Sequence, residues 1–149
     1  MNEPLLPSLP CMCAGLRRAS RALTQFYEEE LRSAGLRATQ FTVLQVLSFV
    51  GELTQGELGR MLAMDSTTLT RTLKIMNRHG WIGRRRGSDR REWRLRLSKA
   101  GVVQLRRALP RWEKVQTQLR LQFGEGQWDA LTKLINNVTN AVAEKGAIS

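Results

Sequence analysis

The spacing of apolar residues along the chain predicts a mainly helical protein. Through most of its length, residues three and four positions apart are apolar, which is the pattern of a helix with one buried face. The stretch from Thr39 to Val50 is apolar nearly all round, which is typical of a helix at the centre of a fold. Six helices are expected, over about 13–32, 39–50, 55–62, 66–79, 99–123 and 127–146.

Capping signals mark the ends of several of these helices. Thr54 and Glu57 have the T-x-x-E spacing of a capping box, in which each side chain binds the other residue's backbone amide. Asp65 and Ser98 are suited to cap the fourth and fifth helices. Gly35 and Gly80 are expected to end the first and fourth helices, and the segment 124–126 to separate the fifth from the sixth. Pro110 is expected to kink the fifth helix.

The third and the sixth predicted helices each have an apolar stripe. The third is short, and its expected buried residues are Leu58, Met61 and Leu62. The sixth has one stripe along its length, made of Trp128, Leu131, Ile135, Val138 and Val142.

One short segment follows a different period. Residues 84–96 read RRRGSDRREWRLR, with seven arginines and two acids. The Gly-Ser-Asp in the middle favours a turn, and beyond it Trp93, Leu95 and Leu97 alternate with two of the arginines. This alternation predicts a hairpin with one half-buried face rather than a solvated tail. Two short helices joined by about three residues and followed by a hairpin are the order of a winged helix-turn-helix.

Composition narrows the class of protein. The chain has 149 residues, of which 42% are hydrophobic, so a single folded domain is expected. Its formal net charge is +11, which attracts polyanions such as nucleic acid or an anionic membrane. A membrane-surface protein needs a basic amphipathic helix, whereas these arginines lie in a turn and a strand. No apolar run approaches a membrane span and no signal segment opens the chain, so we expect a cytoplasmic protein.

The fourth predicted helix has two chemically distinct faces. Leu69, Leu73 and Met76 point to the core, and the other face carries hydroxyls, an amide and cations but no acid. Such a face is suited to base edges and phosphates in a major groove, although a merely solvated face has the same pattern. The alternative is a sequence-independent architectural DNA-binding protein, held by charge alone. The residues expected to contact DNA are Ser66, Thr67, Thr68, Thr70, Arg71 and Lys74 of this helix and Arg86, Arg90 and Arg91 of the hairpin.

The sequence does not have the features of an enzyme. It contains one histidine, with no nucleophile–base pairing and no glycine-rich phosphate loop. Cys11 and Cys13 could join His79 around a metal, but His79 belongs to the end of the fourth helix and no further ligand clusters with it. We therefore expect no catalytic residue, no metal and no cofactor.

The segment 64–101, MDSTTLTRTLKIMNRHGWIGRRRGSDRREWRLRLSKAG, resembles the signature region of the MarR family of bacterial transcription regulators. The likeness includes the fourth helix, the HGWIGR passage, the D-x-R at Asp89–Arg91 and the LS-x-x-G that begins the next helix. It implies that Arg91 enters the minor groove and that Asp89 helps to hold the wing. It also implies that the first, fifth and sixth helices intertwine with those of a second subunit.

The resemblance and the helix pattern together give a domain organisation. A flexible arm, 1–12, precedes one MarR-like domain, 13–149. Apolar stripes at the chain ends exceed what one small winged domain can cover, which also favours a homodimer. A dimeric repressor would bind a palindromic operator in double-stranded DNA, with half-sites about one helical turn apart. The DNA-binding lobe is expected over about 39–98 and the dimerisation helices over about 13–34 and 99–146.

The N-terminal segment 11–27, CMCAGLRRASRALTQFY, resembles the first helix of the organic-hydroperoxide-sensing MarR subgroup. The subgroup's cysteine corresponds to Cys13 and one of its supporting tyrosines to Tyr27, while its other two tyrosine positions are Arg17 and Ala38. The resemblance implies oxidation at Cys13, with Cys11, a partner subunit's cysteine or a small thiol as resolver. A helix N-terminus followed by arginines stabilises a thiolate, although two inert cysteines fit the same positions.

A small aromatic ligand is the other inducer that the resemblance allows. Such pockets tend to occur where the dimer helices meet the DNA-binding lobe. Aromatic residues at helical spacing are also typical of ordinary core packing. The residues considered for the pocket are Phe26, Tyr27, Arg37 and Trp112.

Overall fold

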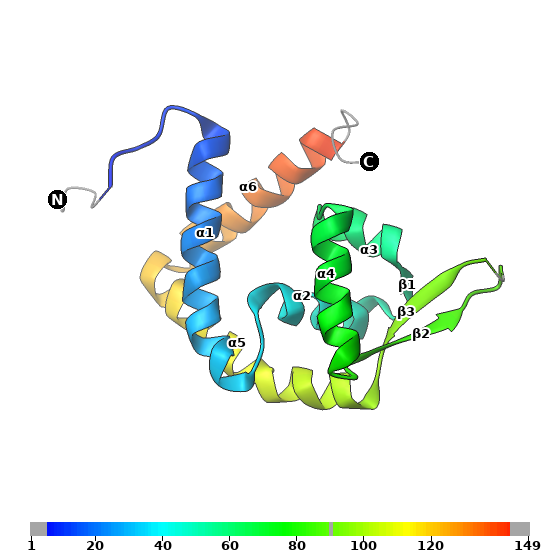
Figure 1. Cartoon of the computed structure of the whole chain (residues 1–149). Coiled ribbons are helices and arrows are strands. Elements are labelled where there is room, and N and C mark those ends of the chain that lie inside the picture. The colour runs from blue at the N-terminus through cyan, green and yellow to red at the C-terminus, as the bar shows by residue number, and fades with distance from the viewer. Residues whose placement is uncertain (1–5, 90, 144–149) are drawn as a thin grey trace.

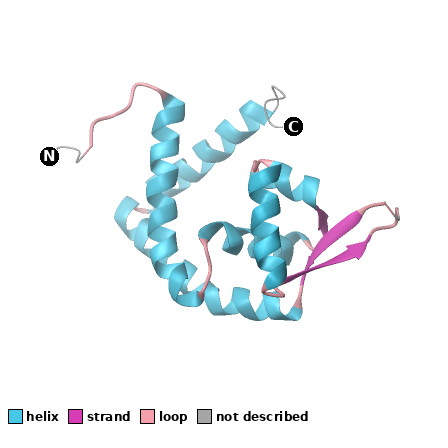
Figure 2. Ribbon diagram, viewed as in Figure 1, coloured by secondary structure: helices cyan, strands magenta, loops and turns pink. Residues whose placement is uncertain are grey.

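The structure, a computed structural model, describes residues 6–89 and 91–143 of the chain. These residues form six α-helices, one short 3-10 helix and a three-stranded sheet (Figures 1 and 2), so the predicted mainly α chain with a small β wing is confirmed. The elements are α1 (Met12–Leu31), η1 (Arg32–Ala34), α2 (Ala38–Val50), β1 (Leu53–Thr54), α3 (Gln55–Leu62), α4 (Ser66–Arg78), β2 (Ile82–Arg86), β3 (Trp93–Leu97), α5 (Lys99–Phe123) and α6 (Glu125–Ala143).

The predicted caps are present. Glu57 Oε2 accepts a hydrogen bond from Thr54 N at 2.7 Å, and Thr54 Oγ1 accepts one from Glu57 N at 3.1 Å, which closes the capping box of α3. Asp65 Oδ1 accepts from the backbone of α4 at 2.9 Å, and Ser98 Oγ does the same for α5. Helix α5 runs through Pro110 without ending there.

Three helix starts differ from the prediction. Helix α6 begins at Glu125 rather than about 127, so Gly124 alone separates it from α5. Helix α1 begins at Met12 rather than Cys13, so the expected arm is shorter by one residue. Helix α2 begins at Ala38 rather than Thr39, with Arg37 as its N-cap, and Gln40 Oε1 accepts a hydrogen bond from Arg37 N at 2.9 Å. Glu28 of α1 adds a longer contact, in which its Oε1 accepts from Ala38 N at 3.4 Å.

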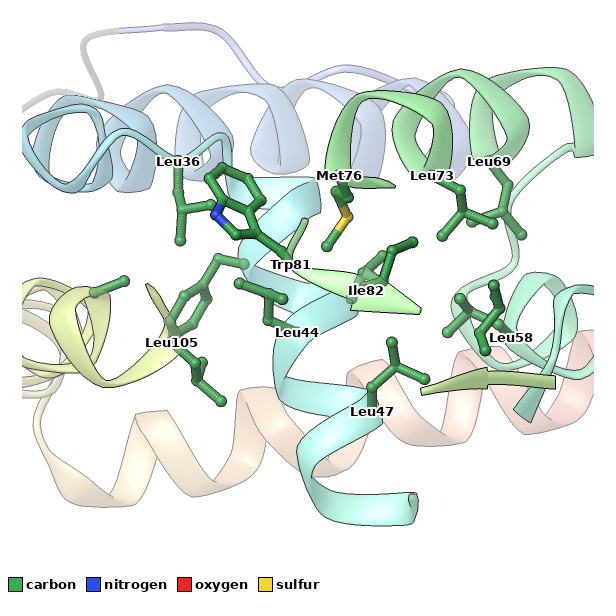
Figure 3. Packing of buried hydrophobic residues seen from close by; sticks show 14 of the residues in the cluster. Leu36, Leu44, Leu47, Leu58, Leu69, Leu73, Met76, Trp81, Ile82 and Leu105 are labelled. Atoms are coloured by element: carbon green, nitrogen blue, oxygen red, sulfur yellow. The ribbon is translucent and has the colours of Figure 1, made fainter. Parts of the chain in front are cut away.

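The core is built around α2, as its apolar sequence predicts. Leu44 and Leu47 lie between the buried residues of α3, α4, β2 and α5 (Figure 3). Two expectations about burial are wrong. Phe49, near the end of α2, is 93% exposed, and Met61 of α3 is 54% exposed while its neighbour Leu58 is fully buried. Periodicity assigned these residues to apolar faces, but no other element covers those positions in the single chain.

The wing is a three-stranded antiparallel sheet in the order β1-β3-β2. The hairpin was predicted, but the two-residue strand β1 was not. Its Leu53 pairs with Leu95, which is buried. Trp93 pairs with Arg86 at the turn end of the hairpin and is 50% exposed, which corrects the expectation that it is half-buried in the same way as Leu95.

Helix α5 connects the lobe to the helices at the chain ends (Figure 1). It contacts α2 on the lobe side and both α1 and α6 on the other. None of the residues of α6 is buried, so its predicted stripe faces outward or toward open space in the single chain. None of the helices within residues 6–89 and 91–143 is long and apolar enough to cross a membrane.

Candidate nucleic-acid interface

Helix α4 separates its two faces as the sequence predicts. Leu69, Leu73 and Met76 are at most 1% exposed and pack into the core (Figure 3). The opposite face is solvent-exposed, and α4 contains no acidic residue; Asp65, directly before the helix, caps it. The predicted contact residues on this exposed face are Ser66, Thr67, Thr68, Thr70, Arg71 and Lys74.

The wing extends from the body of the lobe beside α4 (Figure 1). In its turn Gly87 N donates to Glu92 O at 2.9 Å and Glu92 N donates to Asp89 O at 3.0 Å, and Asp89 Oδ1 accepts from Arg91 N at 2.9 Å. The aspartate therefore lies where wing support was predicted. Within the described residues, the Arg91 guanidinium makes no hydrogen bond or ion pair, and it is exposed. Arg90, another predicted contact, lies outside the described residues.

The root of the wing is fixed to the start of α5. Ser98 N donates to Trp81 O at 3.0 Å, and one turn later Gly101 packs against the same carbonyl. A Cβ on Gly101 would lie 2.0 Å from Trp81 O, a separation that no packed structure tolerates. This contact explains why the LS-x-x-G segment ends in glycine.

The seven arginines of the wing do not share one role. Arg86 lies over the Trp93 ring, 5.1 Å from its centroid, and Arg91 is at the turn. Arg85 instead forms a two-pronged ion pair with Glu52, with N···O distances of 2.7–2.9 Å. Hydrogen bonding from Arg85 lowers the pKa of the Glu52 carboxyl and raises that of the guanidinium. Arg85, which is not among the predicted DNA contacts, is therefore paired within the molecule.

Arg94 is also held within the molecule. Its guanidinium donates to Glu92 Oε1 at 2.6 Å and to the Glu52 backbone oxygen at 2.9 Å, and it lies 3.6 Å from Glu57 Oε2. The hydrogen bond with Glu92 is the first cause of its raised pKa. Because Glu57 also closes the capping box of α3, Arg94 ties the wing to the start of the helix-turn-helix. This role was not predicted from the sequence. It depends on the pairing of β1 with β3, which leaves no periodic pattern of apolar residues.

The two cysteines lie at the N-terminus of α1, on a different helix from the predicted DNA contacts. Cys11 is the N-cap of α1 and Cys13 is in its first turn, and both are free, exposed thiols. Arg18 donates to the Pro7 carbonyl at 2.8 Å, which folds residues 7–10 back toward the helix. Tyr27 follows Cys13 by 14 residues on α1, which places it about 21 Å from Cys13 at 1.5 Å per residue. The chain therefore does not bring Tyr27 to its own Cys13.

Tyr27 instead borders a large apolar groove. Its hydroxyl accepts from Gln116 Nε2 at 2.6 Å, and burial raises its pKa. The groove has a volume of about 840 Å³ and lies between α1, α2, α5 and α6. Phe26 and Trp112 line it as predicted, together with Leu131 and Ile135 of the α6 stripe.

Arg37 does not line this groove, which corrects the prediction. It pairs with Glu28 at 2.8 Å and borders a separate polar cleft of about 270 Å³. His79 lines that cleft too, stacked on Trp81 with ring centroids 4.3 Å apart. Within residues 6–89 and 91–143, no group of three or more histidine, cysteine, aspartate or glutamate side chains is placed to hold a metal ion.

Comparison with known proteins gives a consistent result. A model of the MarR family matches residues 36–93. The chain is 36% identical to the Mycobacterium tuberculosis transcriptional regulator MosR, whose structure was solved in complex with DNA; the match covers 90% of this chain and 97% of that one, with a TM-score of 0.79. It is 29% identical to YwoH, an HTH-type transcriptional regulator of Bacillus subtilis, over 80% of this chain and 87% of that protein.

A more distant structure shares the fold. A mutant of Escherichia coli MarR, solved in complex with operator DNA, is 21% identical and superposes with a TM-score of 0.77 over 85% of this chain and 92% of that one. The relatives with higher identity are transcriptional regulators rather than enzymes.

Proposed function

This chain belongs to the MarR family of winged-helix transcription regulators, and we propose that it is a dimeric repressor on a palindromic operator in double-stranded DNA. The observation that carries this proposal is the acid-free exposed face of α4, which leads directly into an arginine-bearing wing. In this assignment α4 enters the major groove and Arg91 enters the adjacent minor groove. The DNA-binding lobe is the segment 39–98, and the chain lies in the cytoplasm, where its operator is.

The dimer is proposed because the chain leaves one helix without a core. Apart from the partly buried Trp128, the large apolar residues of the α6 stripe and its flank are 38–61% exposed. Together with α1 and α5 they form a surface that a second copy can cover by two-fold symmetry. Two lobes joined in this way can occupy two half-sites about one helical turn apart.

The test of sequence-specific binding is an anisotropy titration of the reduced protein. One duplex is the DNA upstream of its own gene, and the control is a base-shuffled duplex of equal length at the same salt concentration. We expect a preference of at least about 1,000-fold for the upstream DNA. Equal affinity for both would mean that the charge of +11 supplies the binding, as in an architectural protein.

Relief of repression is proposed to act on the distance between the two lobes. An inducer moves the lobes apart until both half-sites can no longer be contacted together. One route is oxidation of Cys13: the thiolate attacks a peroxide oxygen, the O–O bond breaks, and the leaving alkoxide takes up a proton to become an alcohol. The sulfenic acid that forms can then be resolved by Cys11, by a partner subunit's cysteine or by a small thiol. The exposure of both thiols supports this route.

The second route is a small aromatic ligand in the groove that contains Phe26, Tyr27 and Trp112. The two routes are separated by repeating the titration with an organic hydroperoxide on the parent protein and on Cys13→Ser. Release of DNA by peroxide in the parent alone supports the thiol route. Release in both proteins contradicts a role for Cys13, and indifference of the parent leaves the ligand route.

A further inference from the structure

One side chain on the DNA-facing surface of α4 is held by another helix. Gln55 Nε2 donates a hydrogen bond to Thr70 Oγ1 at 2.8 Å. Gln55 is the first residue of α3, directly after the N-cap Thr54, and Thr70 is in the N-terminal half of α4. In a helix-turn-helix, the N-terminal part of the second helix contacts base edges while the first helix crosses the backbone. The pair therefore joins the two helices where both approach DNA.

This bond fixes the hydrogen-bonding direction of the Thr70 hydroxyl. A threonine hydroxyl has one hydrogen to donate and two lone pairs to accept with. Thr72, on the same helix, donates its hydrogen to the Thr68 carbonyl at 3.0 Å, whereas Thr70 donates to no group among the described residues. Since Gln55 already occupies a lone pair of Thr70, the hydrogen of that hydroxyl is left for a partner outside the chain.

We propose that Gln55 is a specificity-determining residue, which sets Thr70 as a donor to one base in each half-site. This inference rests on the proposed function. In the major groove, the acceptors that such a donor reads are N7 or O6 of guanine, N7 of adenine and O4 of thymine. A cytosine presents only its N4 donor there and is rejected at that position. Gln55 thus contributes to base choice although it lies outside the recognition helix.

The test measures base preference rather than affinity alone. Dissociation constants are measured for the parent on duplexes in which each operator position is changed to every other base. Thr70→Val, which replaces the hydroxyl with a methyl group, should lower discrimination at one base pair per half-site by about fivefold, the effect of one hydrogen bond. Gln55→Met should lower discrimination at the same base pair, and the double variant should lose no more than Thr70→Val. Thr72→Val is the matched control, because Thr72 is a threonine of the same helix that is not among the predicted DNA contacts and whose hydroxyl already donates to the Thr68 carbonyl, and it should leave that base pair unaffected.

A charge-bearing variant tests the direction of the bond. In Gln55→Glu the carboxylate only accepts, so Thr70 must donate to it and present a lone pair to the DNA. The preference at that base pair should shift toward a donor, N4 of cytosine or N6 of adenine, while total affinity falls for all sequences alike. Unchanged base preference in both Gln55 variants, with a folded protein by thermal unfolding, would overturn the assignment of Gln55. A parent without any base preference would instead contradict the proposed function itself.

Discussion

The DNA-binding lobe and the C-terminal helix use the same sequence pattern with different results. In the lobe, Leu44, Leu58 and Leu73 lie on helical stripes and are at most 1% exposed, because α2, α3, α4 and the wing root cover one another. In α6 the stripe is as regular, yet Ile135 is 47% exposed and Leu134 beside it 61%. The lobe completes its core from its own chain, and α6 does not.

This difference in burial indicates that the lobe and the C-terminal helix have different roles. A self-contained lobe can hold α4 and the wing in one geometry, as the bonds of Arg94 to Glu92 and Glu52 do at the wing root. In the proposed dimer, the incomplete helical surface is covered by a second copy. Recognition of DNA then depends on the first region, and the joining of two recognition units depends on the second.

The largest effect is expected from a charge on the α6 stripe. Ile135→Asp would place a carboxylate in the proposed interface, and two-fold symmetry would place a second one there. Burying both should cost on the order of 6 kcal/mol of dimerisation free energy. Sedimentation equilibrium should show monomers at micromolar concentration. Asn137→Asp adds the same charge on the opposite face and should leave the dimer intact; equal dissociation of both variants would contradict the interface.

A cavity in the lobe should affect folding. Leu73→Ala removes most of a side chain that lies on the core face of α4 and is 1% exposed. This change should lower the free energy of unfolding by about 2–5 kcal/mol. Urea unfolding followed by circular dichroism measures the loss. Ile75→Ala is the matched control, because Ile75 is on the same helix but 41% exposed, and its loss should be well under half as large. Equal losses of unfolding free energy in the two variants would contradict the assignment of Leu73 to the buried face of α4 and Ile75 to its exposed face.

A wing arginine should affect binding without affecting folding or assembly. Arg91→Ala removes the exposed guanidinium proposed for the minor groove and should weaken operator binding by about 1–3 kcal/mol. The slope of log Kd against log salt should also become shallower by about one. Arg85→Ala is the control, since Arg85 is paired with Glu52 and should leave this slope nearly unchanged. An Arg91→Ala protein with the parent's affinity would contradict the proposed contact between the wing and DNA.

The smallest effect is a pH dependence of the lobe's helix caps. Hydrogen bonds from the Thr54 backbone lower the pKa of Glu57, and hydrogen bonds from the side chain and backbone of Thr68 lower that of Asp65. Carboxyls with a depressed pKa stabilise the fold above their unfolded-state pKa values of about 4, and this contribution is lost as pH falls through the lower folded values. Urea unfolding from pH 7 to about pH 3 should therefore show a smaller decline in a Glu57→Gln/Asp65→Asn double variant than in the parent. Identical declines would show that the caps do not titrate with folding.

Much of the fold could be predicted because its signals are local. The Thr54–Glu57 box and the Asp65 and Ser98 caps are each satisfied within three residues, so short sequence motifs were sufficient. The apolar face of α4 was also correct, since a 3.6-residue period fixes which side chains share a face. The exposed polar face followed directly from that assignment.

The missed features join residues that are distant in sequence. Arg85 and Glu52 are 33 positions apart, Arg94 and Glu52 are 42 apart, and Gln55 and Thr70 are 15 apart. These contacts depend on the pairing of β1 with β3 and on the angle between α3 and α4, neither of which leaves a pattern in the sequence. Periodicity also identifies apolar faces without saying what covers them, which is why the exposure of Phe49 was not foreseen.

The central claim, that self-contained lobes read DNA and the helices at the chain ends couple two of them, is tested most directly with half-sites. An operator located by footprinting is compared with the same duplex after one half-site has been replaced by shuffled sequence, in anisotropy titrations with stoichiometry from sedimentation. We predict two chains per intact operator and a loss of affinity of at least about 100-fold when one half-site is removed. Equal affinity for the two duplexes, with one chain bound to each, would contradict it.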